Sequence, residues 1–203
     1  MVSIITGDIV HSQKAAPKIW LNALKEVLNK AGKSPFTWEI YRGDSFQLEV
    51  TDPAEALTRA IHIKASVKCI KDIDVRMAIG LGDKSHSADS ITESNGTAFV
   101  LSGERYEQLA KEKLNMAIAS RWKDFDKEMN LYIRLALIAM DTWTTNSSEI
   151  VKTVLEHTGK SQEELGKLLG IKQNAVSNRL KRAYFEEIKE LIEMYKTKLK
   201  MLL

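Results

Sequence analysis

The chain has 203 residues, of which 44% are hydrophobic and 28% are charged, and its formal net charge is +3 at pH 7. This length suits one large domain or two small ones, and the composition is ordinary for a globular protein. The single cysteine, Cys69, excludes an intramolecular disulfide and a cysteine-based zinc site. We expect a cytoplasmic protein whose function depends on where its charges lie, because the total charge is small.

The first residues predict a buried strand followed by a helix. Residues 2–10 form a continuous apolar run, as in a central strand, and they lack the basic leader and cleavage site of a signal peptide. No apolar run approaches the roughly 20 residues that cross a bilayer, so we expect no membrane partner. Ser12 is placed to cap the next helix, in which apolar residues recur at helical spacing up to "KAGK".

A β-hairpin is predicted over residues 36–50. Apolar and polar residues alternate with a period of two on both arms, and Gly43 and Asp44 lie at the join. Asp52 and Pro53 then show the pattern of a helix N-cap followed by proline at the first helical position. Because Gly-Asp suits a tight hairpin turn, one interpretation of Asp44 is purely structural.

The next elements complete an α+β domain. They are a strand at 75–81, a polar, mobile loop at 84–97, a helix at 99–111 and a strand at 114–119. The order β-α-β-β-α-β is that of the split βαβ or ferredoxin-like fold, with a helix and an edge strand added. Since the strand patterns then stop, we predict a ferredoxin-like domain over residues 1–121 and an all-helical domain over residues 122–203.

The strongest motif is "SQEELGKLLGIKQNAVSNRLKRA", residues 161–183. Ser161 and Glu164 have the spacing of a capping box, which begins a helix. Gly166 is small, where a second helix must cross closely, and Gly170 suits the left-handed turn that ends the first helix. The pattern resembles the helix-turn-helix of sigma-factor-like and LuxR-type DNA-binding regulators.

The outward side chains of the second helix suit DNA. Residues 172–184 include four basic residues and no acidic one. Polar side chains near the helix start can read base edges, and basic side chains can contact phosphates. The candidate DNA-binding residues are Lys172, Gln173, Asn174, Ser177, Asn178, Arg179, Lys181 and Arg182. The alternative is a helical hairpin used only for packing or for protein contacts.

The last helix carries an apolar stripe with the alternating three- and four-residue steps of a coiled coil. Its members are Phe185, Ile188, Ile192, Tyr195, Leu199 and Leu202. The stripe predicts either a homodimer through the C-terminal helix or packing against the protein's own helices, and both remain open. A dimer would suit a helix-turn-helix, because two copies read two half-sites.

Two aspartates occupy positions that carry metals in enzymes with a similar core. Class III nucleotide cyclases, GGDEF-type enzymes and polymerase palms place one aspartate on the first strand and one at the following hairpin, where the pair holds divalent metals. Asp8 in "TGDIVHS" and Asp44 in "RGDSF" look like the two metal motifs of class III cyclases. The resemblance implies that Asp8 and Asp44 bind Mg²⁺ or Mn²⁺, hard cations that prefer oxygen ligands. It also implies that Ile9, Ser12 and Gly43 contact a nucleotide.

The full motif set is similar to the SatD family, bacterial proteins described as transcriptional regulators. The stretches that carry this resemblance are "TGDIVHS", "YRGDSFQ", "RMAIGLGD" and "NGTAFVLSGER", followed by the helix-turn-helix, and they span nearly the whole chain. The last stretch departs from active cyclases, in which an asparagine and an arginine stabilise the transition state. Val100 occupies the asparagine position, and either Glu104 or Arg105 takes the arginine position. This pattern favours binding a nucleotide over cyclising one.

The sequence thus predicts a DNA-binding transcriptional regulator with a degenerate nucleotide-cyclase-like sensor domain. The alternative is a metal-dependent nucleotidyl transferase or cyclase that acts on nucleoside triphosphates. A third interpretation is an interaction protein that uses neither site. In that case Asp8 would only satisfy backbone N–H groups at the start of the next helix.

Overall fold

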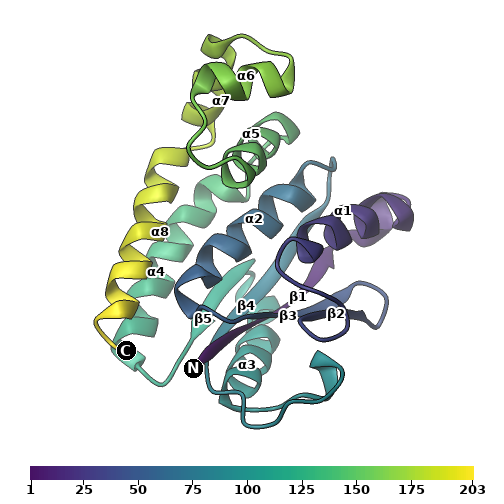
Figure 1. Ribbon diagram of the computed structural model, residues 1–203, viewed down its shortest axis with the longest axis vertical. Coiled ribbons are helices and arrows are strands. Elements are labelled where there is room, and N and C mark those ends of the chain that lie inside the picture. Colours follow the sequence, from purple (N-terminus) through teal and green to yellow (C-terminus); the bar gives the residue numbers. More distant parts are fainter.

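The computed structural model describes all residues, 1–203, as a five-stranded mixed sheet surrounded by eight α-helices (Figure 1). The strands are β1 (Val2–Val10), β2 (Trp38–Tyr41), β3 (Ser45–Val50), β4 (Asp74–Gly82) and β5 (Met116–Ala119). Their spatial order is β2-β3-β1-β4-β5. β1 runs antiparallel to both of its neighbours, β3 and β4, while β5 runs parallel to β4. The predicted α+β class is confirmed.

Helices cover both faces of the sheet, which explains the continuous apolar run of β1. The helices α1 (Pro17–Asn29) and α2 (Ala56–Lys68) lie on one face, and α3 (Thr97–Glu112) lies on the other (Figure 1). Ile5 and Ile9 belong to the large core beneath α1 and α2, whereas Ile4 packs with Ala98 and Phe99 of α3. Successive side chains of a strand point to opposite faces, so both sets of positions are apolar.

The approach of α3 to β4 explains two glycines of "RMAIGLGD". A Cβ atom at Gly80 would meet the Ala98 carbonyl and the Ser102 amide, and one at Gly82 would meet the start of α3. Thr6 of β1 and Ser102 of α3 share a buried hydrogen bond of 2.9 Å beside this contact. The helix can therefore lie directly on the strand.

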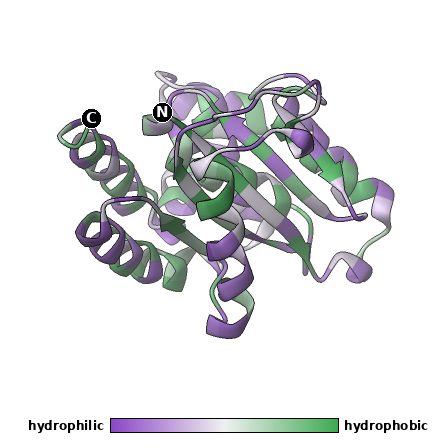
Figure 2. Cartoon of the chain, turned by 90° about the horizontal axis from the view of Figure 1, so that it is seen from below, coloured by the Kyte–Doolittle hydropathy of each residue, from purple (hydrophilic) through white to green (hydrophobic).

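The C-terminal part is entirely helical, as predicted. Its helices are α4 (Lys123–Met140), α5 (Thr145–Glu156), α6 (Gln162–Leu169), α7 (Gln173–Arg182) and α8 (Phe185–Lys200). One hydrophobic core of 42 buried residues contains side chains from both parts of the chain, so the helices do not form a separate core. The helices show alternating apolar and polar positions along the ribbon, as expected when one side of each is buried (Figure 2).

A buried ionic cluster joins the two parts. Lys64 of α2 is fully buried, and its Nζ lies 2.7 Å from Asp74 Oδ1 of β4 and 2.7 Å from Asp141 Oδ1 at the end of α4. Lys68 Nζ contacts Asp74 Oδ2 at 3.0 Å and donates to the Asp141 carbonyl at 2.9 Å. Buried charges need such partners, because an unpaired charge is costly in the interior.

The apolar stripe of α8 faces inward. Phe185, Ile192 and Tyr195 are 5%, 5% and 0% exposed, and the Tyr195 hydroxyl donates to the Pro53 carbonyl at 2.6 Å. Of the two interpretations left open by the sequence, the structure uses the stripe for internal packing. A homodimer would have to form through another surface.

The polar segment 84–97, expected to be mobile, contains a short 3₁₀ helix (Ile91–Glu93), and Ser90 and Thr92 both donate to the Glu39 carboxylate of β2. None of the helices is both long and apolar enough to span a membrane.

Candidate functional site

Asp8 and Asp44 lie at the same end of neighbouring strands. The register pairs Asp8 of β1 with Ser45 of β3, so Asp44 sits one residue away at the hairpin turn. The Ile9 amide donates to the Asp44 carbonyl at 3.2 Å, which holds the turn against β1. The structure therefore places the two aspartates that the sequence singled out at the same edge of the sheet.

Asp8 has an unusual environment on the α3 face of the sheet. Its Oδ1 is buried and has no hydrogen-bond partner, and the nearest cation is Arg76 Nε at 3.9 Å. Burial raises the pKa of the Asp8 carboxyl above its usual value, although Arg76 and Tyr106 act to lower it, and the nearby Asp44 carboxylate raises it further. Burial and the charge of Asp8 together raise the pKa of Tyr106. A buried carboxylate oxygen without a hydrogen bond can accept one from a ligand or coordinate a cation.

The Asp44 carboxylate accepts a hydrogen bond from Ser12, a residue that the sequence predicted to cap the next helix. Ser12 Oγ donates to Asp44 Oδ2 at 2.9 Å. The expectation that Ser12 caps the next helix is wrong, because α1 begins at Pro17 after Ala16, which makes no side-chain cap. Ser12 instead belongs to a 3₁₀ turn (Ser12–Lys14) that brings its hydroxyl back to the hairpin.

Gly43 and Ile9, the other two residues expected to contact a nucleotide, differ in their exposure to solvent. Gly43 is exposed with φ 91° and has open space around it, and Arg42 before it also has a positive φ of 50°. Two successive left-handed residues make the tight turn that hairpins favour. Ile9 is only 2% exposed and its amide is already bonded to Asp44, so its side chain belongs to the core.

The second half of a cyclase site is not assembled beside Asp8. Val100, at the expected asparagine position, lines a cavity with Met1 and Asp83 at the opposite end of β1. Arg105 is engaged by the Glu112 carboxylate at 2.6 and 2.8 Å. No group of three or more histidine, cysteine, aspartate or glutamate side chains is placed to hold a metal. The site thus offers two carboxylates, Ser12 and Tyr106.

The start and end of α6 match the predicted motif. Ser161 Oγ accepts from the Glu164 amide at 3.3 Å and Glu164 Oε2 accepts from the Ser161 amide at 2.8 Å, which makes the capping box. Gly170 ends the helix with φ 65°. A Cβ atom at Gly166 would lie 2.6 Å from the Ile171 carbonyl oxygen, so the turn before α7 closes tightly on α6. These local predictions are confirmed.

α7 presents a polar face to solvent. Val176 and Leu180 are buried, and the Trp143 indole donates to the Ala183 carbonyl at 2.9 Å, which fixes the C-terminal end of the helix. The exposed candidates for DNA contact are Lys172, Gln173, Asn174, Ser177, Asn178, Lys181 and Arg182. Arg179 differs from them, since its Nη1 lies 2.6 Å from Glu149 Oε2 of α5.

The sequence did not predict which side chains contact Asp8 and Arg179. Arg76 and Tyr106 approach Asp8 because of strand register and of the position of α3, and Glu149 reaches Arg179 from 30 residues upstream. No local pattern signals such contacts. No family model, curated protein or solved structure matches the chain.

Proposed function

We propose that the protein is a DNA-binding transcriptional regulator in which α6, the Gly170 turn and α7 form a helix-turn-helix. The observation that carries this proposal is the exposed face of α7, which bears polar and basic side chains and no acidic residue. The side chains of Gln173, Asn174 and Lys181 form no hydrogen bond or ion pair within the chain. A helical hairpin used only for packing would not need this face to be free of acidic residues.

The distribution of side chains along α7 fits the major groove. Gln173, Asn174 and Ser177 lie in the first turns, where the amides can bond to adenine edges. Lys181 and Arg182 lie at the other end and are free to contact phosphates. Arg179 forms an ion pair with Glu149, so it stabilises the packing of α7 on α5 and is not the first phosphate contact to test.

The DNA proposal is tested by fluorescence anisotropy with the full chain. Lys181→Ala with Arg182→Ala should weaken binding to all DNA sequences, since phosphate contacts carry no sequence information. Gln173→Ala should instead change the preferred sequence, at a cost of about 1–3 kcal/mol for the best site. Lys111→Ala with Lys127→Ala is the matched control, because it removes the same charge from exposed positions on α3 and α4. Equal loss in both double variants would contradict the proposal.

We further propose that residues 1–121 form a ferredoxin-like, cyclase-like sensor that binds a nucleotide through Asp8 and Asp44. The strand order β2-β3-β1-β4, with β1 antiparallel to both neighbours, supports this assignment, as does the resemblance to the SatD family. In support of this proposal, Asp8 Oδ1 is buried without a hydrogen bond, and Asp44 is near enough for its charge to raise the pKa of Asp8. Two carboxylates fit a Mg²⁺ ion that takes its other ligands from water and phosphate.

In such a complex the side chains of the protein would position the cation and attract the phosphates. Asp8 and Asp44 would hold the cation, Ser12 would keep the Asp44 carboxylate oriented, and the Arg76 guanidinium would attract the phosphates. The metal, when bound, neutralises phosphate charge. Because Val100 and Arg105 are directed elsewhere, binding without turnover is the function we favour.

The sensor is tested by thermal unfolding with Mg²⁺ and nucleoside triphosphates. At about 100 times Kd a ligand of the folded state adds about 2.7 kcal/mol, which raises Tm by about 5–10 °C for a chain of this size. Asp44→Asn and Asp8→Asn should abolish the rise, and Asp89→Asn, an exposed control, should not. Turnover of a triphosphate that is lost in the same two variants would instead favour the enzyme. An unchanged wild-type Tm would contradict the sensor.

A further inference from the structure

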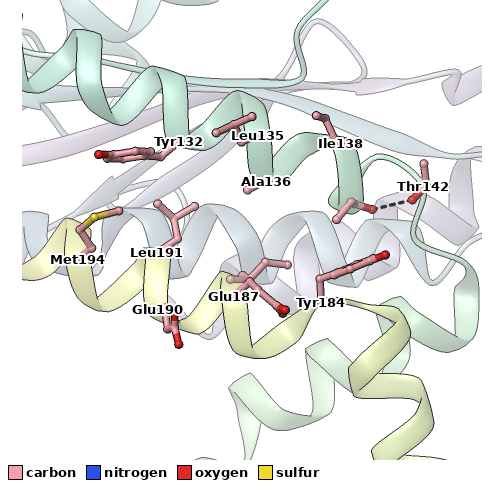
Figure 3. Close-up of a pocket in the computed structure, with 12 residues that line it drawn as sticks. Tyr132, Leu135, Ala136, Ile138, Thr142, Tyr184, Glu187, Glu190, Leu191 and Met194 are labelled. Atoms are coloured by element: carbon pink, nitrogen blue, oxygen red, sulfur yellow. Dashed lines mark hydrogen bonds between the residues drawn. The ribbon is translucent and has the colours of Figure 1, made fainter.

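An open apolar groove runs between α4 and α8. Its volume is about 830 Å³ and nine of its twelve lining residues are hydrophobic. Figure 3 shows Tyr132, Leu135 and Ile138 along α4, across the groove from Leu191 and Met194 of α8 and from Tyr184, which precedes α8. We call this surface the α4–α8 face.

The sequence of α4 suits a helix that is covered on all sides. Residues 131–140, "LYIRLALIAM", contain one charge, Arg134. The inward positions of this stretch are buried in the core, yet Leu131, Leu135 and Ile138 are 46%, 57% and 71% exposed. Their spacing of four and three residues makes one stripe on the outer side of the helix. Contiguous exposed apolar surface of this kind marks an interaction site.

No other segment of residues 1–203 lines the groove. The inward stripe of α8 packs against the core, and the groove is lined by the flank of α8 next to that stripe, with Ile188 belonging to both. Together the two helices, of 18 and 16 residues, extend over about 27 and 24 Å at 1.5 Å per residue. With helix axes about 8–10 Å apart and helix diameters of about 10 Å, the face covers about 500 Å² per partner, or about 1,000 Å² in total, which reaches the lower limit for a specific interface.

We infer that the α4–α8 face is covered by a second copy of this chain, related by a two-fold axis. The charges around the apolar stripe are self-complementary. Arg134 lies beside the exposed stripe of α4, whereas Glu187 and Glu190 line the groove from α8, and no ion pair within the chain includes any of the three. A two-fold rotation presents the same patch on both copies, so Arg134 of each copy faces the acidic helix of the other. The apolar helices then pair as a four-helix bundle.

If the protein binds DNA as proposed, the dimer would also set the relative positions of its two α7 helices. Tyr184 on this face follows α7 by only two residues, so the dimer would fix two α7 helices relative to each other. Two recognition helices held in this way can read two half-sites. The assembly itself does not depend on DNA binding, and its test uses no DNA.

The test is light scattering on the full chain at about 50 µM, a concentration at which a micromolar dimer is well populated. The wild type should be a dimer, and Ile138→Glu should be a monomer with an unchanged circular dichroism spectrum, because Ile138 is already exposed. Ile19→Glu is the matched control, since Ile19 is 54% exposed on α1, and it should remain a dimer. Arg134→Glu should dissociate the dimer, and adding Glu187→Lys and Glu190→Lys should restore it.

A monomeric wild type, or a dimer that persists in Ile138→Glu, overturns the inference. A monomeric wild type that binds an apolar dye through the groove would assign the face to a different apolar partner and would also overturn it. Failure of the charge exchange to restore a dimer contradicts the two-fold arrangement. DNA binding is measured separately, so loss of the dimer and failure of the DNA proposal can be told apart.

Discussion

Replacing Asp74 by asparagine should expose how strongly the ionic cluster joins the two parts of the chain. Asp74 contacts Lys64 Nζ at 2.7 Å and Lys68 Nζ at 3.0 Å, and Lys64 is fully buried. Asparagine keeps the shape but leaves both ammonium groups without this carboxylate. Removing one partner of a buried pair costs about 3–5 kcal/mol. Because Asp141 still contacts Lys64 and is partly exposed, we expect the lower value of about 3 kcal/mol.

The assay is thermal and urea unfolding of the full chain. A loss of about 3 kcal/mol lowers Tm by about 6–12 °C for a chain of this length. Adding Lys64→Met to Asp74→Asn should recover part of the loss, since it removes the buried charge that lost its partner. Glu163→Gln is the control, because its pair with Lys167 is exposed and should leave Tm unchanged. A small effect of Asp74→Asn, or an additive loss in the double variant, would refute the reasoning.

Three other predictions concern packing and pH. Tyr195→Phe should cost about 1–3 kcal/mol in urea unfolding, because it leaves a buried backbone carbonyl without its donor; a cost near zero would contradict the role of that bond. Gly166→Ala should cost about 1–3 kcal/mol and speed amide exchange in α6 and α7, since its Cβ would press on the Ile171 carbonyl; unchanged exchange would count against the close turn. Burial lowers the pKa of His62 below 6.5 in the folded state despite the carboxylate beside it, so the unfolded chain takes up the proton first and stability falls as pH drops below about 6.5. The urea midpoint should therefore fall more between pH 7.5 and 5.5 in the wild type than in His62→Gln, and equal falls would exclude this contribution.

The sequence predicted those features that are determined locally. The capping box at Ser161, the left-handed Gly170 and the close approach at Gly166 depend on a few neighbouring residues, and all were predicted. The strand alternation also predicted the hairpin, while the expected strand order, a property of the whole domain, placed Asp8 and Asp44 at neighbouring positions. Short-range steric and hydrogen-bonding preferences are enough for such features.

The remaining features depend on contacts between distant segments. Ser12 bonds to Asp44 instead of capping α1, because the chain makes a 3₁₀ turn before the helix begins. The coiled-coil stripe of α8 could not reveal whether its partner was another chain or the protein's own core, since both bury the same residues. Arg179 suited a phosphate contact until Glu149 was placed beside it. Tertiary packing decides between such alternatives.

The most direct test of the central claim is the salt dependence of DNA binding. Lys172, Lys181 and Arg182 are exposed cations on or next to α7. Three phosphate contacts give a slope of about −2.7 for log K against log salt, or about a 40-fold loss between 50 and 200 mM. We predict this slope per bound copy for the wild type, a slope of about −1 for Lys181→Ala with Arg182→Ala, and no change for Lys111→Ala with Lys127→Ala. Absence of salt-dependent binding by the wild type, or the same slope in all three proteins, would contradict a DNA-binding role for α7.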